Sequence, residues 1–383
     1  MVAIDSYAGG DGRLSPLSTP SATRAVLEAH GIGTKYTLGQ NFLVNDNVLK
    51  KIIALAEVGE NDRILEVGPG IGTLTIALLK HAASVIAIER DPDLPVVLAD
   101  TLHPWREKFA LIEKDALDVT RDDIVSVAST MVEPGGDTGY PDRASSAANE
   151  TAQWAVSQSE DCLSESGYPV APPQEDLQLS LPSKLVANLP YAVAATVVLD
   201  YFESFPFLDS ATIMVQKEVA DRMVAAVGTK NYGAYTVKLG LYAEPAGRFA
   251  VGPGNFFPPP RVDSAVIRLN RRVPLRADGA PASPEVIAAA ALMADAAFTN
   301  RRKTIANSCK TYFSGRGPIL LGVADSSAAE GAPTIALPDG AAIAERLAAI
   351  FDAATIDPRR RGETLTQQEF LALGAALLKV TAA

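Results

Sequence analysis

A glycine-rich turn between an apolar strand and a helix constrains the fold of this chain more than any other feature. Residues 64–67 are apolar apart from Glu66, residues 73–81 have a helical pattern, and residues 84–88 form a second apolar run. The turn between the first two segments contains three glycines, Gly68, Gly70 and Gly72. Glycine is needed where a strand turns tightly into a helix. The pattern predicts a βαβ unit whose turn presents backbone N–H groups to a ligand.

The alternation of short β-rich runs and helical stretches continues along the chain. Further β-rich runs occupy residues 109–113, 184–187 and 211–215. This order is typical of an α/β fold of the Rossmann type, for which we expect a doubly wound, mostly parallel sheet with an antiparallel edge. Towards the C-terminus three helical patterns follow without strands between them, over residues 284–298, 341–351 and 367–380. They predict a small all-α C-terminal domain.

Composition suggests where the domains begin and end. Residues 1–33 are rich in small residues and carry one short helical pattern, so we interpret them as an N-terminal arm. We assign residues 34–274 to the α/β domain and residues 275–383 to the helical domain. Residues 130–183 and 314–340 lack a periodic apolar face, and we expect them to be disordered or flexible insertions.

The net charge of −11 argues at first against a polyanionic partner, because phosphate binding depends largely on Lys and Arg. The charge is unevenly distributed, however. Residues 130–183 contain nine acidic residues and one basic residue, whereas residues 211–310 contain fourteen basic and seven acidic residues. Since local fields steer a nucleic acid, the second region remains able to bind RNA.

Cysteine usage and hydropathy exclude several classes of protein. Cys162 and Cys309 lie far apart and the chain has three histidines, so we expect neither a disulfide framework nor a metal site. No apolar run approaches the roughly 18 residues of a membrane span, and the N-terminal residues lack the order of a signal peptide. These features predict a cytoplasmic protein without membrane contact.

Acidic residues follow the second and third predicted strands, where a nucleoside bound at the turn would need partners. Glu89 ends the second strand, and its carboxylate can accept hydrogen bonds from ribose hydroxyls. Asp115 follows the third strand and is placed to meet an adenine amino group. A dinucleotide site is the alternative, but it needs glycine three residues after Gly70, where this chain has Thr73. The difference favours the nucleoside of S-adenosylmethionine.

The most specific short motif follows the fourth strand and consists of Asn188, Leu189, Pro190 and Tyr191. Adenine N6 is a poor nucleophile because its lone pair is delocalised, so acceptors must hold its two hydrogens during methyl transfer. We assign this role to the Asn188 side-chain oxygen and the Leu189 carbonyl, with Pro190 stiffening the turn. Tyr191 offers a ring on which an extruded base can stack, and we expect Phe256 to supply a second ring. A loop with a merely buried tyrosine is the alternative, but the position behind the glycine-rich turn favours the functional interpretation.

Further motifs occur in order along the chain, over residues 35–43, 215–222, 231–235, 256–264, 301–305 and 361–370. Together they resemble one family, the KsgA-type ribosomal RNA adenine dimethyltransferases, over most of the chain outside the arm and the insertions. The resemblance implies a class I methyltransferase fold that binds S-adenosylmethionine. It also implies dimethylation of N6 on two adjacent adenosines near the 3′ end of small-subunit (16S) rRNA. One departure is that residues 192–195 are apolar where the family has polar residues, which bears on how the next helix is capped.

The resemblance also implies site residues and partners. The cofactor site is expected to include Asn41, Leu43, Gly68, Glu89, Asp115 and Asn188, to which the glycine-rich turn adds Gly70. Six basic residues are expected to contact RNA, namely Arg222, Arg261, Arg268, Arg301, Arg302 and Lys303. For any one of them a solvated surface position is the alternative. The implied partner is 16S rRNA in the immature small subunit, bound by a monomer without a metal.

Three other functions are compatible with parts of the sequence. A large-subunit rRNA adenine methyltransferase of the resistance type shares the core, but the basic run at residues 301–303 and the long helical tail favour the small subunit. A mainly non-catalytic assembly factor would keep the fold, and the presence of Asn188 and Tyr191 argues against it. A nicotinamide oxidoreductase leaves the Asn188 motif unexplained.

Overall fold

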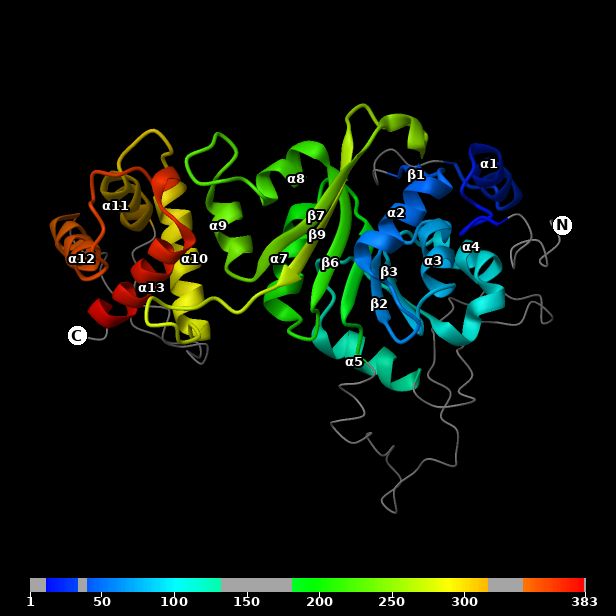
Figure 1. Ribbon diagram of the computed structural model, residues 1–383, viewed down its shortest axis with the longest axis horizontal. Helices are drawn as coiled ribbons and strands as arrows, with labels where there is room; N and C mark the ends of the chain where they lie inside the picture. The colour runs from blue at the N-terminus through cyan, green and yellow to red at the C-terminus, as the bar shows by residue number, and fades with distance from the viewer. Residues whose placement is uncertain (1–11, 34–39, 132–180, 316–339, 382–383) are drawn as a thin grey trace, which may run out of the picture. The chain divides into compact units, whose positions relative to one another are not determined.

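The computed structural model describes residues 12–33, 40–131, 181–315 and 340–381 (Figure 1). The chain divides into two compact units. Unit 1 comprises the residues up to Lys217 together with Ala246–Asn270, and unit 2 comprises Glu218–Pro245 and Arg271–Ala383. Most of the two expected insertions, the first eleven residues and residues 34–39 lie outside the described part of the chain. No helix in the described part is long and apolar enough to span a membrane.

The main sheet of the described chain has seven strands in the order β4-β3-β2-β5-β6-β9-β7. Their bounds are β2 (Arg63–Val67), β3 (Ser84–Glu89), β4 (Phe109–Glu113), β5 (Lys184–Asn188), β6 (Ser210–Gln216), β7 (Ala243–Val251) and β9 (Ser264–Arg271). From β4 to β6 all neighbours are parallel, and β9 pairs antiparallel with β6. This confirms the predicted mostly parallel sheet with antiparallel pairing towards one edge.

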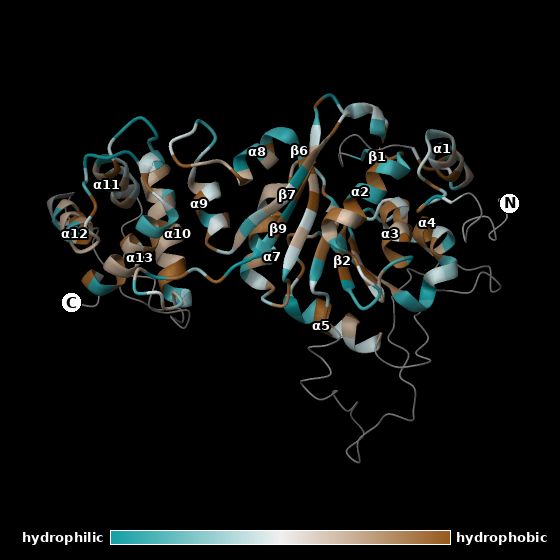
Figure 2. Cartoon of the chain, viewed as in Figure 1, coloured by the Kyte–Doolittle hydropathy of each residue, from teal (hydrophilic) through white to brown (hydrophobic). Residues whose placement is uncertain are grey.

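Helices pack around the sheet in unit 1 (Figure 1). They are α1 (Pro20–Ala29), α2 (Asp46–Ala56), α3 (Thr73–Leu79), α4 (Leu94–Thr101), α5 (Arg121–Thr130) and α7 (Ala194–Ser204), with the 3-10 helix η3 at His103–Lys108. Every residue of α3 is buried, and the helix is coloured mainly as hydrophobic in Figure 2. The helix after the glycine-rich turn is therefore held in place by the core on all sides.

The position of helix α1 differs from the expectation that residues 1–33 form a separate N-terminal arm. Leu17, Val26 and Leu27 are at most 4% exposed and belong to the hydrophobic core of unit 1. The Asp46 carboxylate at the start of α2 accepts hydrogen bonds from the backbone N–H groups of Leu14 and Ser15, at 2.7 and 3.3 Å. Residues 14–29 are therefore part of unit 1 and not a separate arm, because their few apolar side chains suffice to anchor one short helix.

A small second sheet joins two segments that are far apart in sequence. Strand β1 (Phe42–Leu43) pairs antiparallel with β8 (Phe256–Phe257), and the 3-10 helix η5 (Pro253–Asn255) precedes β8. The backbone N–H of Val44 donates to the Asn255 carbonyl at 2.8 Å. This sheet fixes the residues just after Asn41 to the segment that leads into β9.

Unit 2 is mainly helical, and its helices are α8 (Lys217–Met223, whose first residue belongs to unit 1), α9 (Ala234–Gly240), α10 (Pro284–Phe298), α11 (Ile305–Gly315), α12 (Gly340–Ala353) and α13 (Gln367–Thr381), with η8 at Gly362–Thr364. The three predicted C-terminal helices are present. The sequence assigns residues 218–245 to the α/β domain, but the structure places them in unit 2. The reason is that Tyr232 and Val237 are buried in the same core as α10 and α13. The helix α11 was not predicted, although Ile305, Cys309 and Phe313 line its buried face.

Candidate active site

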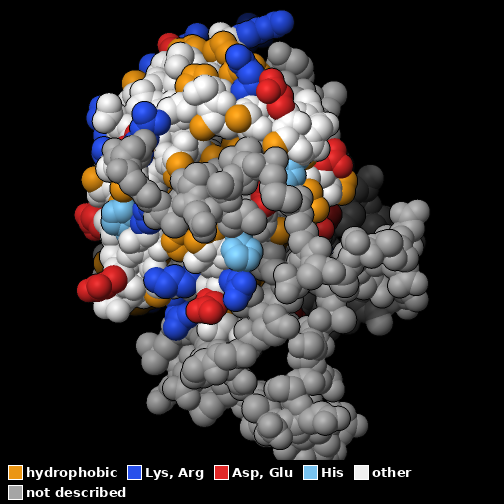
Figure 3. Space-filling model, turned by 90° about the vertical axis from the view of Figure 1, so that its right-hand side faces the viewer, with side chains coloured by type: hydrophobic (Ala, Val, Ile, Leu, Met, Phe, Trp, Pro, Cys, Tyr) orange, Lys and Arg blue, Asp and Glu red, His pale blue; other side chains and the backbone are white. Residues whose placement is uncertain are grey.

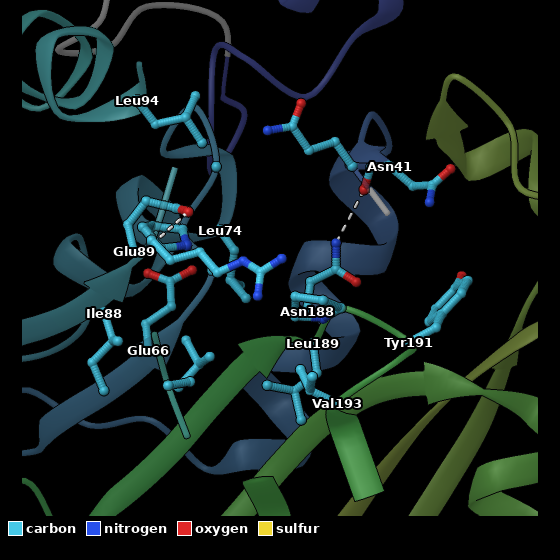
Figure 4. Close-up of a pocket in the computed structure, with 18 of the residues that line it drawn as sticks. Asn41, Glu66, Leu74, Ile88, Glu89, Leu94, Asn188, Leu189, Tyr191 and Val193 are labelled. Carbon is cyan, nitrogen blue, oxygen red and sulfur yellow. Dashed lines mark hydrogen bonds between the residues drawn. The ribbon is translucent and has the colours of Figure 1, made fainter. Parts of the chain in front are cut away.

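A cavity of about 510 Å³ opens in unit 1 at the carboxyl ends of the parallel strands. The last residues of β2, β3, β5 and β6, and the residues just after β4, contribute to its lining. Figure 4 shows Glu66 and Glu89 on one side of this cavity and Asn188 and Tyr191 on the other. In an open α/β sheet this edge is where ligands usually bind.

The glycine-rich turn forms one wall of the cavity, as predicted. Gly68, Gly70 and Gly72 all have positive φ angles, of 69°, 61° and 88°. A Cβ atom on Gly70 would come within 3.2 Å of the Phe42 ring, and one on Gly72 within 3.0 Å of Leu102. These positions need glycine both for the backbone conformation and for the close packing of the turn.

Glu89 lines the cavity and is 9% exposed. Burial raises the pKa of its carboxyl, although the N–H groups of Arg90 and Asp91 both donate to Oε1 at 2.9 Å. These bonds to Oε1 fix the direction in which the side chain points. The geometry agrees with a carboxylate that is oriented to accept hydrogen bonds.

Asp115 also lines the cavity, but it already has partners within the protein. The N–H of Leu117 donates to Oδ1 at 3.1 Å, and Nη1 of Arg90 lies 2.7 Å from Oδ2. The hydrogen bond from Leu117 and then the one from Arg90 keep the pKa of Asp115 below its ordinary value. Asp115 is therefore charged and oriented, and Arg90 joins it in the lining of the cavity.

Sequence reasoning missed Glu66 as a pocket residue. It is 1% exposed, lines the cavity, and its pKa is raised to about 8 by burial. Within the described structure Oε2 of Glu66 and Oγ1 of Thr73 are buried without a hydrogen-bond partner, and both residues line the cavity. Buried polar atoms of this kind usually find a partner, so both are suited to meet polar atoms of a bound ligand. The available signal was a charged residue inside an otherwise apolar strand.

The Asn188 motif is held from three directions. Nδ2 of Asn188 donates to the Asn41 carbonyl at 3.2 Å (Figure 4), and the N–H of Leu189 donates to the Met214 carbonyl at 3.1 Å. The Tyr191 hydroxyl lies 2.6 Å from Oγ of Ser264. Because a carbonyl can only accept, the first bond assigns the amide nitrogen of Asn188 and leaves Oδ1 as the acceptor end of the side chain.

The helix that follows the motif begins without a side-chain cap. The N–H groups of Val193 and Ala194 donate instead to the Pro190 carbonyl, at 3.2 and 3.1 Å. This is the structural consequence of the apolar residues 192–195. The Pro190 carbonyl takes over the capping and ties the motif to the first turn of α7.

The structure does not bring Phe256 to the cavity. Its side chain is 4% exposed within the core of unit 1, and its backbone pairs with Leu43 in the small sheet. The expectation that Phe256 supplies a second stacking ring is therefore corrected, because its side chain packs in the core of unit 1. Of the other predicted site residues, Asn41, Leu43, Gly68, Gly70, Leu189, Pro190 and Tyr191 line the cavity.

Two of the six basic residues expected to bind RNA are bonded to residues distant in sequence, and a third, Arg222, lies 3.8 Å from the Glu218 carboxylate one turn away in α8. Arg268 is bonded to the Leu55 carbonyl at 3.0 Å and to the Glu57 carboxylate at 2.7 Å, at the end of α2. Arg301 pairs with Glu363 at 2.8 Å and donates to the Thr229 carbonyl at 2.9 Å. Each of these guanidinium groups makes two polar contacts within the protein and so stabilises the fold. Sequence spacing could not distinguish this structural role from an RNA contact.

The other four basic residues are exposed: Arg222, Arg261, Arg302 and Lys303. In unit 2, Arg302 and Lys303 line a shallow open hollow together with Asn307 and Lys310 of α11. On the face shown in Figure 3, in contrast, basic and acidic side chains are interspersed. Within the described residues, no group of three or more His, Cys, Asp and Glu side chains could hold a metal ion.

Comparison with known proteins supplies the family. The family model described as ribosomal RNA adenine dimethylase matches residues 33–330. A ribosomal RNA small subunit methyltransferase A of Geobacillus sp. is 33% identical over 95% of this chain and 98% of its own length. The protein of the same name from Enterococcus faecalis is 32% identical over 95% of this chain and 97% of its own. A crystal structure of a dimethyladenosine transferase from Plasmodium falciparum has the same fold, with a TM-score of 0.57 and 19% identity over 88% of this chain and 98% of its own. The chain therefore belongs to the ribosomal RNA adenine dimethylase family.

Proposed function

We propose that this protein transfers methyl groups from S-adenosylmethionine to N6 of two adjacent adenosines near the 3′ end of small-subunit rRNA, giving dimethyladenosines. The observation that carries the proposal is the orientation of Asn188. Its amide nitrogen is engaged by the Asn41 carbonyl, so its oxygen is the acceptor in a cavity that also contains the glycine-rich turn and the Tyr191 ring. The names of the curated relatives agree with this reaction.

The cavity fits the proposed cofactor. Its volume of about 510 Å³ lies within the usual range for small-molecule sites. Gly68, Pro69 and Gly70 of the turn line the cavity, and the oriented carboxylate of Glu89 suits ribose hydroxyls. Asn41, Leu43 and Asp115 complete the residues that would hold the group, and the orphaned oxygen of Glu66 suits a donor. When bound, S-adenosylmethionine supplies an electrophilic methyl carbon on a sulfonium sulfur.

The residues of the motif act on the adenine. Oδ1 of Asn188 and the Leu189 carbonyl accept the two hydrogens of N6, which favours a pyramidal nitrogen whose lone pair is free to attack. The Tyr191 ring holds the base after it leaves its stack, an interaction that contributes about 1–3 kcal/mol per base. Asn188 and Leu189 are themselves fixed by hydrogen bonds to Asn41 and Met214, so the acceptors are in position before the base arrives, and the bond to Ser264 fixes the Tyr191 ring.

The RNA is held by the exposed basic residues. Arg302 and Lys303, with Lys310, line the hollow at α11 and contact phosphates there, while Arg261 and Arg222 contribute from other segments. Arg268 and Arg301 support the fold instead. The substrate is the immature small subunit in the cytoplasm, and the protein acts as a monomer without a metal.

The proposal is tested by incubating the protein with methyl-labelled S-adenosylmethionine and, in parallel, immature small subunits, free small-subunit rRNA and large subunits. Label in dimethyladenosine with small subunits alone is expected. Asn188→Ala should remove the label, and Asn47→Ala, the same change at an exposed position on α2, should keep it. Label in the large subunit would identify a large-subunit enzyme, and binding without label an assembly factor; either result refutes the proposal.

A further inference from the structure

The Tyr191 side chain is anchored at both of its ends. Its backbone follows Pro190 in the motif, and at the far end of the ring its hydroxyl lies 2.6 Å from Oγ of Ser264, 73 residues further along the chain. The ring is half-buried and lines the cavity. A tyrosine held at both ends cannot change its rotamer without breaking the hydroxyl contact.

Ser264 is itself rigidly placed. It is the first residue of β9, is 0% exposed, and pairs in register with Gln216 at the end of β6. The preceding residue, Asp263, accepts a hydrogen bond from the N–H of Lys217 at 2.9 Å through its carbonyl. Gln216 lines the same cavity as Tyr191. The Ser264 hydroxyl is therefore a fixed point on the sheet beside the active site.

We propose that Ser264 is a positioning residue, which sets the tilt of the Tyr191 ring through the hydroxyl–hydroxyl hydrogen bond and so presents the ring face to the target adenine. The inference rests on the proposed function, because it assumes that a base stacks on this ring. It explains why a serine is fully buried at this point, since among the residues that the structure describes its hydroxyl has a hydrogen-bond partner only in Tyr191. A neutral hydrogen bond of this kind corresponds to a change of about 2- to 12-fold in binding or rate.

A double-mutant cycle with Ser264→Ala and Tyr191→Phe tests the inference. Both variants keep the ring and remove one hydroxyl. Each is expected to lower kcat/KM for RNA by a similar factor of about 2 to 12, and the double variant should be no worse than either one, because both remove the same contact. Ser210→Ala is the matched control, because Ser210 is 4% exposed and lies at the opposite end of the β6–β9 ladder. It should leave activity unchanged.

Two further measurements separate positioning from a general structural effect. The dissociation constant for S-adenosylmethionine should be the same in Ser264→Ala and the unchanged protein. An RNA with 2-aminopurine at the target position should lose part of its fluorescence quenching in both single variants, a readout that does not need methyl transfer. Multiplicative losses in the double variant, or full activity and quenching in Ser264→Ala, would overturn the inference. If the unchanged protein neither labels nor quenches the RNA, the proposed function fails, and this inference fails with it.

Discussion

Replacing Glu66 by Gln is expected to make the stability of the free protein less sensitive to rising pH. Glu66 lies among apolar side chains on β2, and burial raises the pKa of its carboxyl from 4.5 to about 8. Between these two values the unfolded chain has lost this proton while the folded chain retains it. The contribution of Glu66 to stability is therefore full below pH 4.5, falls as the pH rises, and stays lost above about pH 8.

The size of the effect follows from the pKa difference. One proton corresponds to about 1.4 kcal/mol of unfolding free energy for each pH unit. The interval from 4.5 to about 8 thus gives a total of up to about 5 kcal/mol. Because an amide stays neutral throughout, the advantage of Glu66→Gln over the unchanged protein should grow by about 1.4 kcal/mol per unit from pH 5 to pH 8.

Urea unfolding at half-unit steps from pH 5 to pH 9, without cofactor, measures this difference. Trp105 packs against the core of unit 1 and reports its unfolding, in a background with Trp154→Phe. Glu113→Gln is the control, because Glu113 is exposed at the end of β4, which is separated from β2 by β3 in the same sheet. A constant difference between Glu66→Gln and the unchanged protein across this range would refute the reasoning that burial keeps the carboxyl protonated.

Three other predictions follow from described contacts. Asn188→Ala removes one preorganised acceptor and should lower kcat by about 10²–10³-fold while RNA affinity in filter binding is kept; full activity would contradict the assigned role. Replacing Arg302 and Lys303 together by Ala should reduce the salt dependence of RNA binding by up to about two phosphate equivalents, and an unchanged slope would remove the hollow from the interface. Gly72→Ala should lower the free energy of unfolding by about 1–2 kcal/mol because of its φ of 88°, and by more because of the contact with Leu102. In chemical denaturation this loss should exceed that of Gly228→Ala, where φ is 81° but a Cβ atom would meet open space. Equal losses would argue against the steric effect.

The parts of the site that are local in sequence could be predicted. The glycine-rich turn, Glu89 and the Asn188 motif lie at the carboxyl ends of β2, β3 and β5, and parallel strands bring these ends to one edge of the sheet. The alternation of strands and helices and the helical C-terminal region followed from hydrophobic periodicity in the same way. Helix α11 was missed although its buried residues Ile305, Cys309 and Phe313 recur every four positions, the spacing of one helical face.

The remaining features depend on partners that are distant in sequence. Arg268 lies on a basic segment, but its bond to the Leu55 carbonyl spans 213 residues. Phe256 has an aromatic ring of the kind that can stack on a base, yet its backbone pairing with Leu43 places it in the core. Ser264 acquires significance only through Tyr191, and no periodicity marks such a contact. Sequence patterns indicate which side of a helix or strand is buried and where the element ends. The roles of these residues depend instead on contacts between side chains that are far apart in sequence.

The three bonds that hold the motif also determine when the site can exist during synthesis. They come from Asn41, 147 residues before Asn188, from Met214, and from Ser264, which lies 73 residues after Tyr191. A ribosome that has translated the glycine-rich turn and the motif has therefore not yet produced the strand that fixes the aromatic ring. The glycine-rich turn and the strands beside it can form early in synthesis, but the Tyr191–Ser264 hydrogen bond must wait until β9 has left the exit tunnel.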